Sequence, residues 1–360
     1  MTTADSTVPG LFARTWAGTR QAYIASPGFD LVFFLLSPLL ILAAAEAAGA
    51  FEWPFERTRA LGDVDMRLAF CVGVFSTAHL FGVFFRSHAN GEIFAQHRLR
   101  FLAVPPLLFA ALVLSEWALV CAFVLAAAWD IWHTALQNFG IGRIYDARLG
   151  NPPEQGRQLD IVLHLLVYVG PLVAGPSLYR SLQDVERFGA LGWDAPARGL
   201  AGLAAIQSQL APVILAGGAL FLVYYVLSYR RLVRGGYRVS RQKIVMLVSV
   251  AATSIFAWSV LPPLEAMVIT TSYHALQYFG IVWWAEKRSI RRVLGLRRIA
   301  GGALAFAAWM AVLLLAALAT EAGSRSTLRA AWAFGLVVAL IHFWYDGFIW
   351  SVRRREVRPG

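Results

Sequence analysis

The chain has 360 residues, of which 58% are hydrophobic and only 15% are charged, and its mean hydropathy is +0.59. This composition excludes an ordinary soluble domain, in which about a quarter of the residues are charged, and predicts a chain that lies mostly in lipid. The net charge of +11 does not indicate nucleic-acid binding, because basic residues beside apolar spans are typical of cytoplasmic loops near anionic headgroups. Cys71 and Cys121 both fall in apolar runs, which excludes a disulfide framework and a CxxC site.

The first element in chain order is a basic, aromatic segment over residues 1–28, which we expect to be cytoplasmic or to lie along the membrane interface. The first long apolar run begins at Phe29 and no small-residue cleavage site follows it, so this run is interpreted as an uncleaved first span. The rest of the chain is predicted to be one transmembrane helical domain, residues 29–351, followed by a basic cytoplasmic tail, residues 352–360.

Apolar stretches predict an all-α, polytopic membrane protein with about ten transmembrane helices. The predicted spans are 29–50, 67–85, 100–114, 117–142, 159–179, 209–229, 244–261, 264–286, 299–320 and 328–351. The third span is short and contains Pro105 and Pro106, so we expect a broken or re-entrant element there.

The distribution of basic residues predicts the orientation. With ten crossings and a cytoplasmic N-terminus, 24 of the 32 Lys and Arg residues fall on the inner side. Cytoplasmic loops carry this excess in membrane proteins. The sequence therefore predicts that both termini are cytoplasmic, as in a protein of the bacterial inner membrane.

Four histidines lie in spans that run from outside to inside, and we expect them at one depth. They are His79, His133, His274 and His342. Their distances along the helices from the first inner basic residues correspond to roughly 10 to 20 Å. A lone histidine in such a helix more often makes an interhelical hydrogen bond, but four at one depth can converge on a metal ion.

Polar residues accompany these histidines at helical spacing. Asp346 follows His342 by four residues, while Asp130 precedes His133 by three and Gln137 follows it by four. Such pairs share a helix face, and a metal-bound imidazole usually gives its second N–H to a carboxylate or amide. We predict His79, His133, His274, His342 and Asp346 as metal ligands, with Asp130, Gln137, Gln277 and His164 as the groups that orient them.

Other polar and aromatic positions have simpler interpretations. Asp160 lies four residues before His164 but also near Arg157, which favours a solvated helix end. Trp284 and Trp350 lie nearest the predicted inner edge and are expected in the interfacial aromatic belt. His88 and His97 are expected in the inner loop after the second span, where we assign them no ligand role.

One segment is repeated in the chain. "ALQNFGI" at 135–141 matches "ALQYFGI" at 275–281 in six of seven residues, and the two spans run in the same direction, which suggests a parallel duplication. Both copies keep a histidine and a glutamine on one helix face. Gly140 and Gly280 are expected to allow close helix approach.

The predicted ligands favour iron, copper or zinc, since imidazoles and a carboxylate suit these metals and no thiolate takes part. In layout the chain resembles the integral-membrane non-haem iron oxygenases, desaturases and hydroxylases, which have histidine clusters at the inner face. The HxxHH and HxxxH boxes of those families are missing, so no family residue is carried across. The resemblance implies non-haem iron, a lipid or isoprenoid substrate and a cytosolic electron donor, with O2-dependent oxidation, desaturation or cleavage as the reaction.

Two alternatives remain open at this point. A b-type haem held by two of the histidines would explain imidazoles on facing helices, with Arg86 or Arg143 near a propionate. A proton-coupled transporter would use Asp and His in its helices, with "AVPPLL" and "VLPPLE" as helix interruptions.

Overall fold

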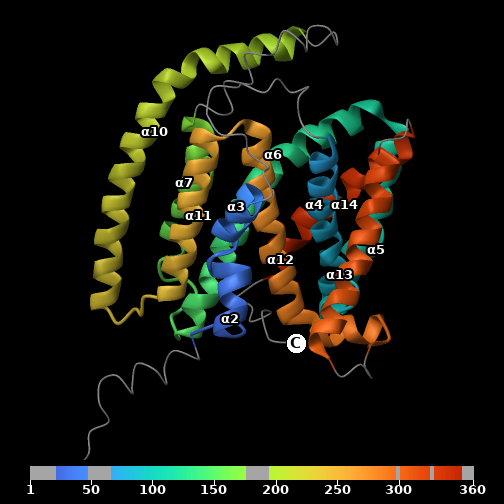
Figure 1. Cartoon of the computed structure of the whole chain (residues 1–360), viewed down its shortest axis with the longest axis horizontal. Helices are drawn as coiled ribbons and strands as arrows, with labels where there is room; N and C mark the ends of the chain where they lie inside the picture. The colour runs from blue at the N-terminus through green and yellow to red at the C-terminus, as the bar shows by residue number, and fades with distance from the viewer. Residues whose placement is uncertain (1–21, 48–65, 176–193, 297–300, 325–327, 351–360) are drawn as a thin grey trace, which may run out of the picture.

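The computed structural model describes residues 22–47, 66–175, 194–296, 301–324 and 328–350, and Figure 1 shows their arrangement. Within these ranges every regular element is a helix, which confirms the all-α prediction. The elements are α2 (Pro27–Asp30), the π-helical turn η1 (Leu31–Leu35), α3 (Ser37–Ala47), α4 (Met66–Ser87), α5 (Gly91–Leu114), α6 (Glu116–Arg148), α7 (Arg157–Ala174), α10 (Asp194–Arg234), α11 (Arg241–Val260), α12 (Pro263–Val293), α13 (Gly302–Ser324) and α14 (Arg329–Ile349). The predicted basic tail and residues 1–21 of the predicted N-terminal segment lie outside the described residues.

Within the described residues, each of the ten predicted spans overlaps a helix. In the described part of the chain, seven helices are long and apolar enough to cross a membrane by themselves: α5, α6, α7, the part of α10 over Gln209–Arg234, α11, α13 over Gly302–Gly323, and α14. The bent unit from α2 to α3 makes eight if it counts as one span. Helices α4 and α12, which carry His79 and His274, are not among these seven.

The first predicted span is not one straight helix. The axis turns by 69° between Leu35 and Ser37. Pro38, at the second position of α3, has no N–H to donate to the preceding turn, and this loss accounts for the break.

The third span is longer than expected and is not broken at its prolines. Helix α5 continues through Pro105 and Pro106, and its backbone departs from helical geometry at His97 instead (φ −124°, ψ 20°). It begins early because the Asn90 side chain accepts hydrogen bonds from the first-turn N–H groups of Glu92 and Ile93. The predicted break is therefore at His97, just before the predicted span, and not at the two prolines.

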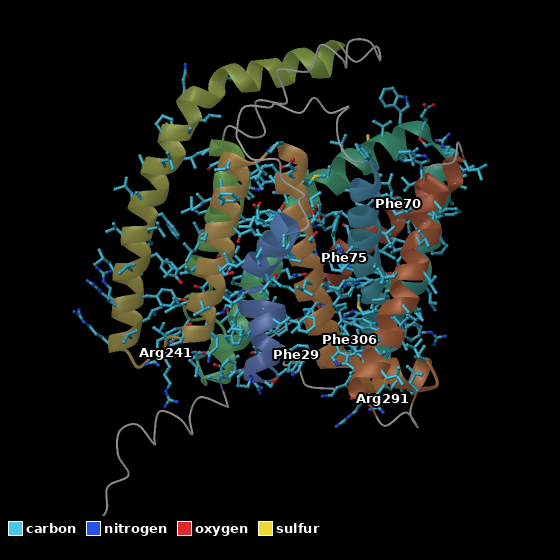
Figure 2. All side chains as sticks on the ribbon, viewed as in Figure 1. Phe29, Phe70, Phe75, Arg241, Arg291 and Phe306 are labelled. Carbon is cyan, nitrogen blue, oxygen red and sulfur yellow. The ribbon has the colours of Figure 1, made fainter. Side chains whose placement is uncertain are left out.

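The helices are arranged around α4, α6, α12 and α14. Helix α4 packs against α12, α13 and α14, while α14 also packs against α5 and α6. On the other side, α7 packs against α6, α10 and α11, and α10 lies at the edge of the molecule (Figure 1). Side chains fill the interior, and Arg241 and Arg291 lie at the same end of the bundle (Figure 2).

The two repeated glycines have different surroundings. A Cβ at Gly280 would lie 2.7 Å from the Cβ of Phe33 in η1, so only glycine fits there. A Cβ at Gly140 would have no heavy atom within 4 Å. The expectation of close helix approach is therefore correct for Gly280 and wrong for Gly140.

We expect Gly280→Ala to destabilise the protein by about 1–3 kcal/mol, because the added methyl group would overlap Phe33 in a packed interior. Gly140→Ala is the matched control, since the same methyl group enters open space. Thermal unfolding in detergent micelles measures the difference. Equal effects of the two substitutions would show that Phe33 does not pack closely on α12.

Candidate metal centre

The four predicted histidines meet at one point between α4, α6, α12 and α14. The centroid of the His79 ring lies 4.9 Å from the ring centroids of His274 and His342. The centroid of the His133 ring lies 5.1 Å from that of His274 and 4.9 Å from that of His342. The four pairs cross at 73–88°, so the rings stand edge to face. None of the four residues is more than 6% exposed.

Several nitrogens of these rings are buried without a hydrogen-bond partner. The His79 Nδ1–H donates to the Ser76 carbonyl, which leaves a lone pair on Nε2. Among the described residues, His79 Nε2, both nitrogens of His274 and His342 Nδ1 are unpaired, while His342 Nε2 lies 3.1 Å from His133 Nε2. Buried polar atoms are rarely left unpaired, because their desolvation is costly. A cation between the rings would supply the missing partner.

Asp346 faces the same point from α14. Its Oδ1 accepts hydrogen bonds from the Tyr278 hydroxyl and the Trp350 indole N–H, both at 3.0 Å. Its Oδ2 lies 3.8 Å from His133 Nε2 and 3.7 Å from His342 Nε2. The Tyr278 and Trp350 donors therefore hold Oδ1 in place, and Oδ2 faces the imidazoles of His133 and His342.

The ligand atoms form two overlapping groups, each with all its atoms within 4.8 Å of one another. One group is His79, His274 and His342, and the other is His133, His342 and Asp346. Because both contain His342, the geometry favours one centre rather than two separate ones. Imidazoles with one carboxylate suit iron, copper or zinc.

The paired glutamines of the repeat contact each other. Gln137 Nε2 donates to the backbone carbonyl of His274 at 3.0 Å and to Gln277 Oε1 at 3.3 Å. Gln137 thus holds the main chain of α12 beside a histidine rather than the imidazole itself. Asp130 lies close enough to Tyr168 for an electrostatic interaction between the two side chains.

His164 belongs to a second buried group. Its Nδ1 lies 2.7 Å from the Asp160 carbonyl, and a Cβ at Gly142 would lie 3.7 Å from its Nε2. The structure therefore brings His164 to Asp160 and not to the four rings. Asp160 is completely buried, so the prediction that it is a solvated helix end is wrong.

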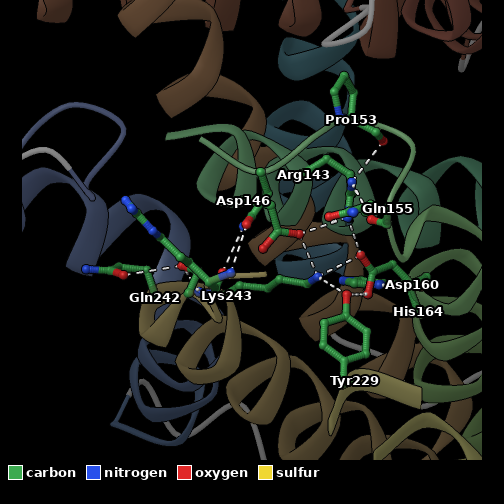
Figure 3. Close-up of polar contacts among 12 residues, drawn as sticks. Arg143, Asp146, Pro153, Gln155, Asp160, His164, Tyr229, Gln242 and Lys243 are labelled. Atoms are coloured by element: carbon green, nitrogen blue, oxygen red, sulfur yellow. Dashed lines mark hydrogen bonds and ion pairs between the residues drawn. The ribbon is translucent and has the colours of Figure 1, made fainter. Parts of the chain in front are cut away.

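Figure 3 shows this second group, which we call the charge cluster: Arg143, Asp146, Asp160 and Lys243. Arg143 Nη1 lies 2.9 Å from Asp146 Oδ2 and 2.7 Å from Asp160 Oδ2, and Lys243 Nζ lies 2.7 and 2.6 Å from the same atoms. The Tyr229 hydroxyl donates to Asp160 Oδ1 at 2.6 Å. Two cations balance two carboxylates, and the cluster joins α6, α7 and α11.

His88 and His97 lie against aromatic side chains. The His88 ring is 5.2 Å from that of Phe101, and the His97 ring is 4.6 Å from that of Phe348. Burial lowers the pKa of His88, which lies in the connection between α4 and α5. His97 is inside α5, so the prediction that it lies in a loop is wrong.

An ion pair that the sequence did not predict lies next to Trp350. Arg86 Nη1 is 2.5 Å from Glu286 Oε1, and Arg86 Nη2 donates to the Ile349 carbonyl at 3.0 Å. The guanidinium also lies 4.5 Å from the centre of the Trp350 ring. Trp350 therefore contacts Arg86 in addition to Asp346. Trp284 is buried, so the prediction that it lies in the interfacial belt is wrong.

A groove of about 740 Å³ reaches the centre from one side. It is lined by Trp129, Trp132, His133, Leu136, Gln137, Phe139, Gly140, Ile141, Arg143, Ile144, Pro153, Glu154, Arg157, Tyr278, Ile281, Phe343, Trp344, Asp346, Gly347, Phe348 and Trp350. Of the candidate ligands only His133 and Asp346 line it. The other three histidines lie behind them, so a molecule in the groove meets the centre from the side of His133 and Asp346.

No protein-family model, curated protein or solved structure matches this chain. The four histidines, Asp346 and the groove beside them are therefore the basis on which a function is inferred.

Proposed function

We propose that this protein is a membrane-embedded oxidoreductase that binds one non-haem iron ion and uses O2 to oxidise, desaturate or cleave a lipid or isoprenoid chain. The observation that carries the proposal is the set of four buried imidazoles, whose rings lie about 5 Å apart and include nitrogens without a hydrogen-bond partner. Iron bound there would supply the O2 chemistry, and a cytosolic electron donor would supply the electrons that the substrate does not.

The residues around the proposed ion have different roles. His79, His274 and His342 hold the ion from the closed side, while His133 and Asp346 hold it from the side of the groove. Tyr278 and Trp350 keep the Asp346 carboxylate turned so that one oxygen faces the imidazoles. Metal ligands are commonly oriented by such partners.

The groove supports an apolar substrate. Most of its lining is aromatic or aliphatic, and Trp132 in its wall is 48% exposed on the surface of a helix that is long and apolar enough to cross a membrane. A ligand site of this kind binds an apolar body and uses a few polar groups to orient it. An acyl or isoprenoid chain enters such a groove from the bilayer.

For the topology we propose ten crossings with both termini in the cytoplasm of a bacterium. Three connections that join consecutive helices on the predicted inner side, between α4 and α5, α6 and α7, and α10 and α11, contain or adjoin basic residues. Arg241 and Arg291 lie at the same end of the bundle, which agrees with an inner face rich in positive charge (Figure 2). The four histidines then lie in the inner half of the membrane.

The alternatives have less support from the geometry. Haem needs two imidazoles on opposite faces of a wide macrocycle, whereas each ring here is in edge contact with two others and leaves no room for one. A proton-coupled transporter would use the charge cluster, but its charges are already paired within the cluster.

Elemental analysis with a visible spectrum tests the proposal. We expect the detergent-purified full chain to carry about one equivalent of iron and no Soret band, because imidazole and carboxylate ligands suit that metal without a porphyrin. A Soret band would replace the proposal with a haem protein. Protein that holds no transition metal after gentle purification would exclude a metalloenzyme.

A further inference from the structure

The groove runs lengthwise along α6, and its α6 lining extends from Trp129 to Ile144. At 1.5 Å per residue this part of the helix is about 22 Å long. His133, the histidine in the groove wall, is not in the middle. It lies about 6 Å from the Trp129 end and about 16 Å from the Ile144 end.

The two ends of the groove differ in chemistry. Beyond Ile144 the lining continues to Glu154 and Arg157 at the start of α7, and both side chains are exposed. The Arg157 guanidinium lies 5.6 Å from the centre of the Phe139 ring, which brings a charge to the edge of the apolar wall. The opposite end is formed by Trp129 and Trp132, and beyond His133 the lining there has no further ionisable side chain. A chain with one polar end fits with that end at Arg157 and its tail at the tryptophans.

From these positions we infer that the centre acts on an internal carbon of a single chain, about seven carbons from its polar end, with about five carbons beyond. The Arg157 guanidinium lies at the level of Phe139, which is about 9 Å along α6 from His133. A zigzag carbon chain with bonds of about 1.5 Å advances roughly 1.25 Å per carbon, so 9 Å corresponds to about seven carbons and the 6 Å beyond His133 to about five. This inference rests on the proposed function and adds the substrate class and the position of attack.

Two glycines leave space in the part of the groove where the substrate chain would lie. Gly140 on α6 and Gly347 on α14 both line it, and a Cβ at either position would have no heavy atom within 4 Å. A large side chain at Gly140 would fill the groove without displacing a packed neighbour. It would separate the Arg157 end from His133.

Photo-crosslinking with fatty-acid probes tests the placement without using the reaction. Two dodecanoic acids, one with a diazirine next to the carboxyl end and one with it at about carbon seven, are bound to the detergent-purified full chain and irradiated. We expect the first probe to label residues 139–144 and the second to label 133–136 and 343–344, as mapped by peptide mass spectrometry.

Gly140→Phe should remove most of this labelling because it fills the groove. Gly217→Phe is the matched control, since Gly217 on α10 also has open space at its Cβ position but lies far from the groove lining. Labelling in the reverse order along α6, or the same labelling with both probes, would overturn the inference, as would labelling that Gly140→Phe leaves unchanged.

The two proposals fail in different ways. Ordered labelling of a protein that holds no iron would keep the groove assignment and remove the oxygenase. Iron without ordered labelling would keep the metal centre and overturn the position of the chain.

Discussion

Replacing His342 by alanine is expected to empty the metal centre. His342 is the member shared by both groups of candidate ligands, so its loss removes the ligand that joins the two groups into one centre. The substitution removes a polar group from a membrane helix, which does not penalise insertion. Iron content of the purified variant should therefore fall to background while its helical circular dichroism is unchanged.

Two other histidines are the controls for this experiment. His164 is buried like the four rings, and His97 lies against Phe348. His164→Ala and His97→Ala should both retain iron. Tyr278→Phe, which removes one hydrogen bond to Asp346, should weaken metal affinity by about 10- to 100-fold without abolishing it. An empty site in His97→Ala together with a full site in His133→Ala would show that the ligands are assigned wrongly.

Asp160→Asn is expected to cost about 3–5 kcal/mol of stability, because it leaves an uncompensated cation buried in the charge cluster. Asp160 is completely buried and contacts Arg143, Lys243 and Tyr229 directly. The substitution keeps the size of the side chain, so the loss measures the charge. Unfolding in mixed detergent micelles gives the free-energy difference.

The cluster itself provides a second test of this prediction. The double variant Asp160→Asn with Lys243→Met restores the balance of one cation and one carboxylate, so it should lose less stability than the two single variants together. Glu92→Gln, at an exposed position in the first turn of α5, should change stability by about 0.5 kcal/mol or less. Additive losses in the double variant would mean that the cluster does not act as a unit.

The convergence of the four histidines could be predicted because it depends on local regularities. Apolar runs give the helices, the helical rise gives the depth of each histidine, and the direction of each span gives a common level. Asp346 could be assigned to the face of His342 by its spacing of four residues. The structure brings these five side chains together.

The charge cluster and the donors to Asp346 could not be predicted, since they depend on contacts between distant parts of the chain. Asp160 and Lys243 are 83 residues apart, and Tyr278 and Asp346 are 68 apart. Next to Arg157 in the sequence, Asp160 has the pattern of a solvated helix end. Only the packing of α7 against α11 shows that Lys243 covers it.

The repeated segment is a second case in which contacts between distant parts of the chain decide a role that the sequence could not predict. Gly140 and Gly280 occupy equivalent positions in two nearly identical segments, so the sequence assigns them one role. In the structure η1 packs against α12 at Gly280, whereas the corresponding surface of α6 at Gly140 borders the groove. The neighbours of each segment decide the role, and these neighbours are not repeated.

The four histidines of the site come from both halves of the chain, so the site can form only late in synthesis. His79 and His133 come from the first half of the chain and each lies beside His274 and His342 from the second half. A growing chain on the ribosome therefore has at most two of the histidines until α12 is synthesised, and it lacks Asp346 until α14 is inserted. The proposed ion can be captured only after α14 has packed against the other three helices, so its uptake would mark their assembly in the membrane.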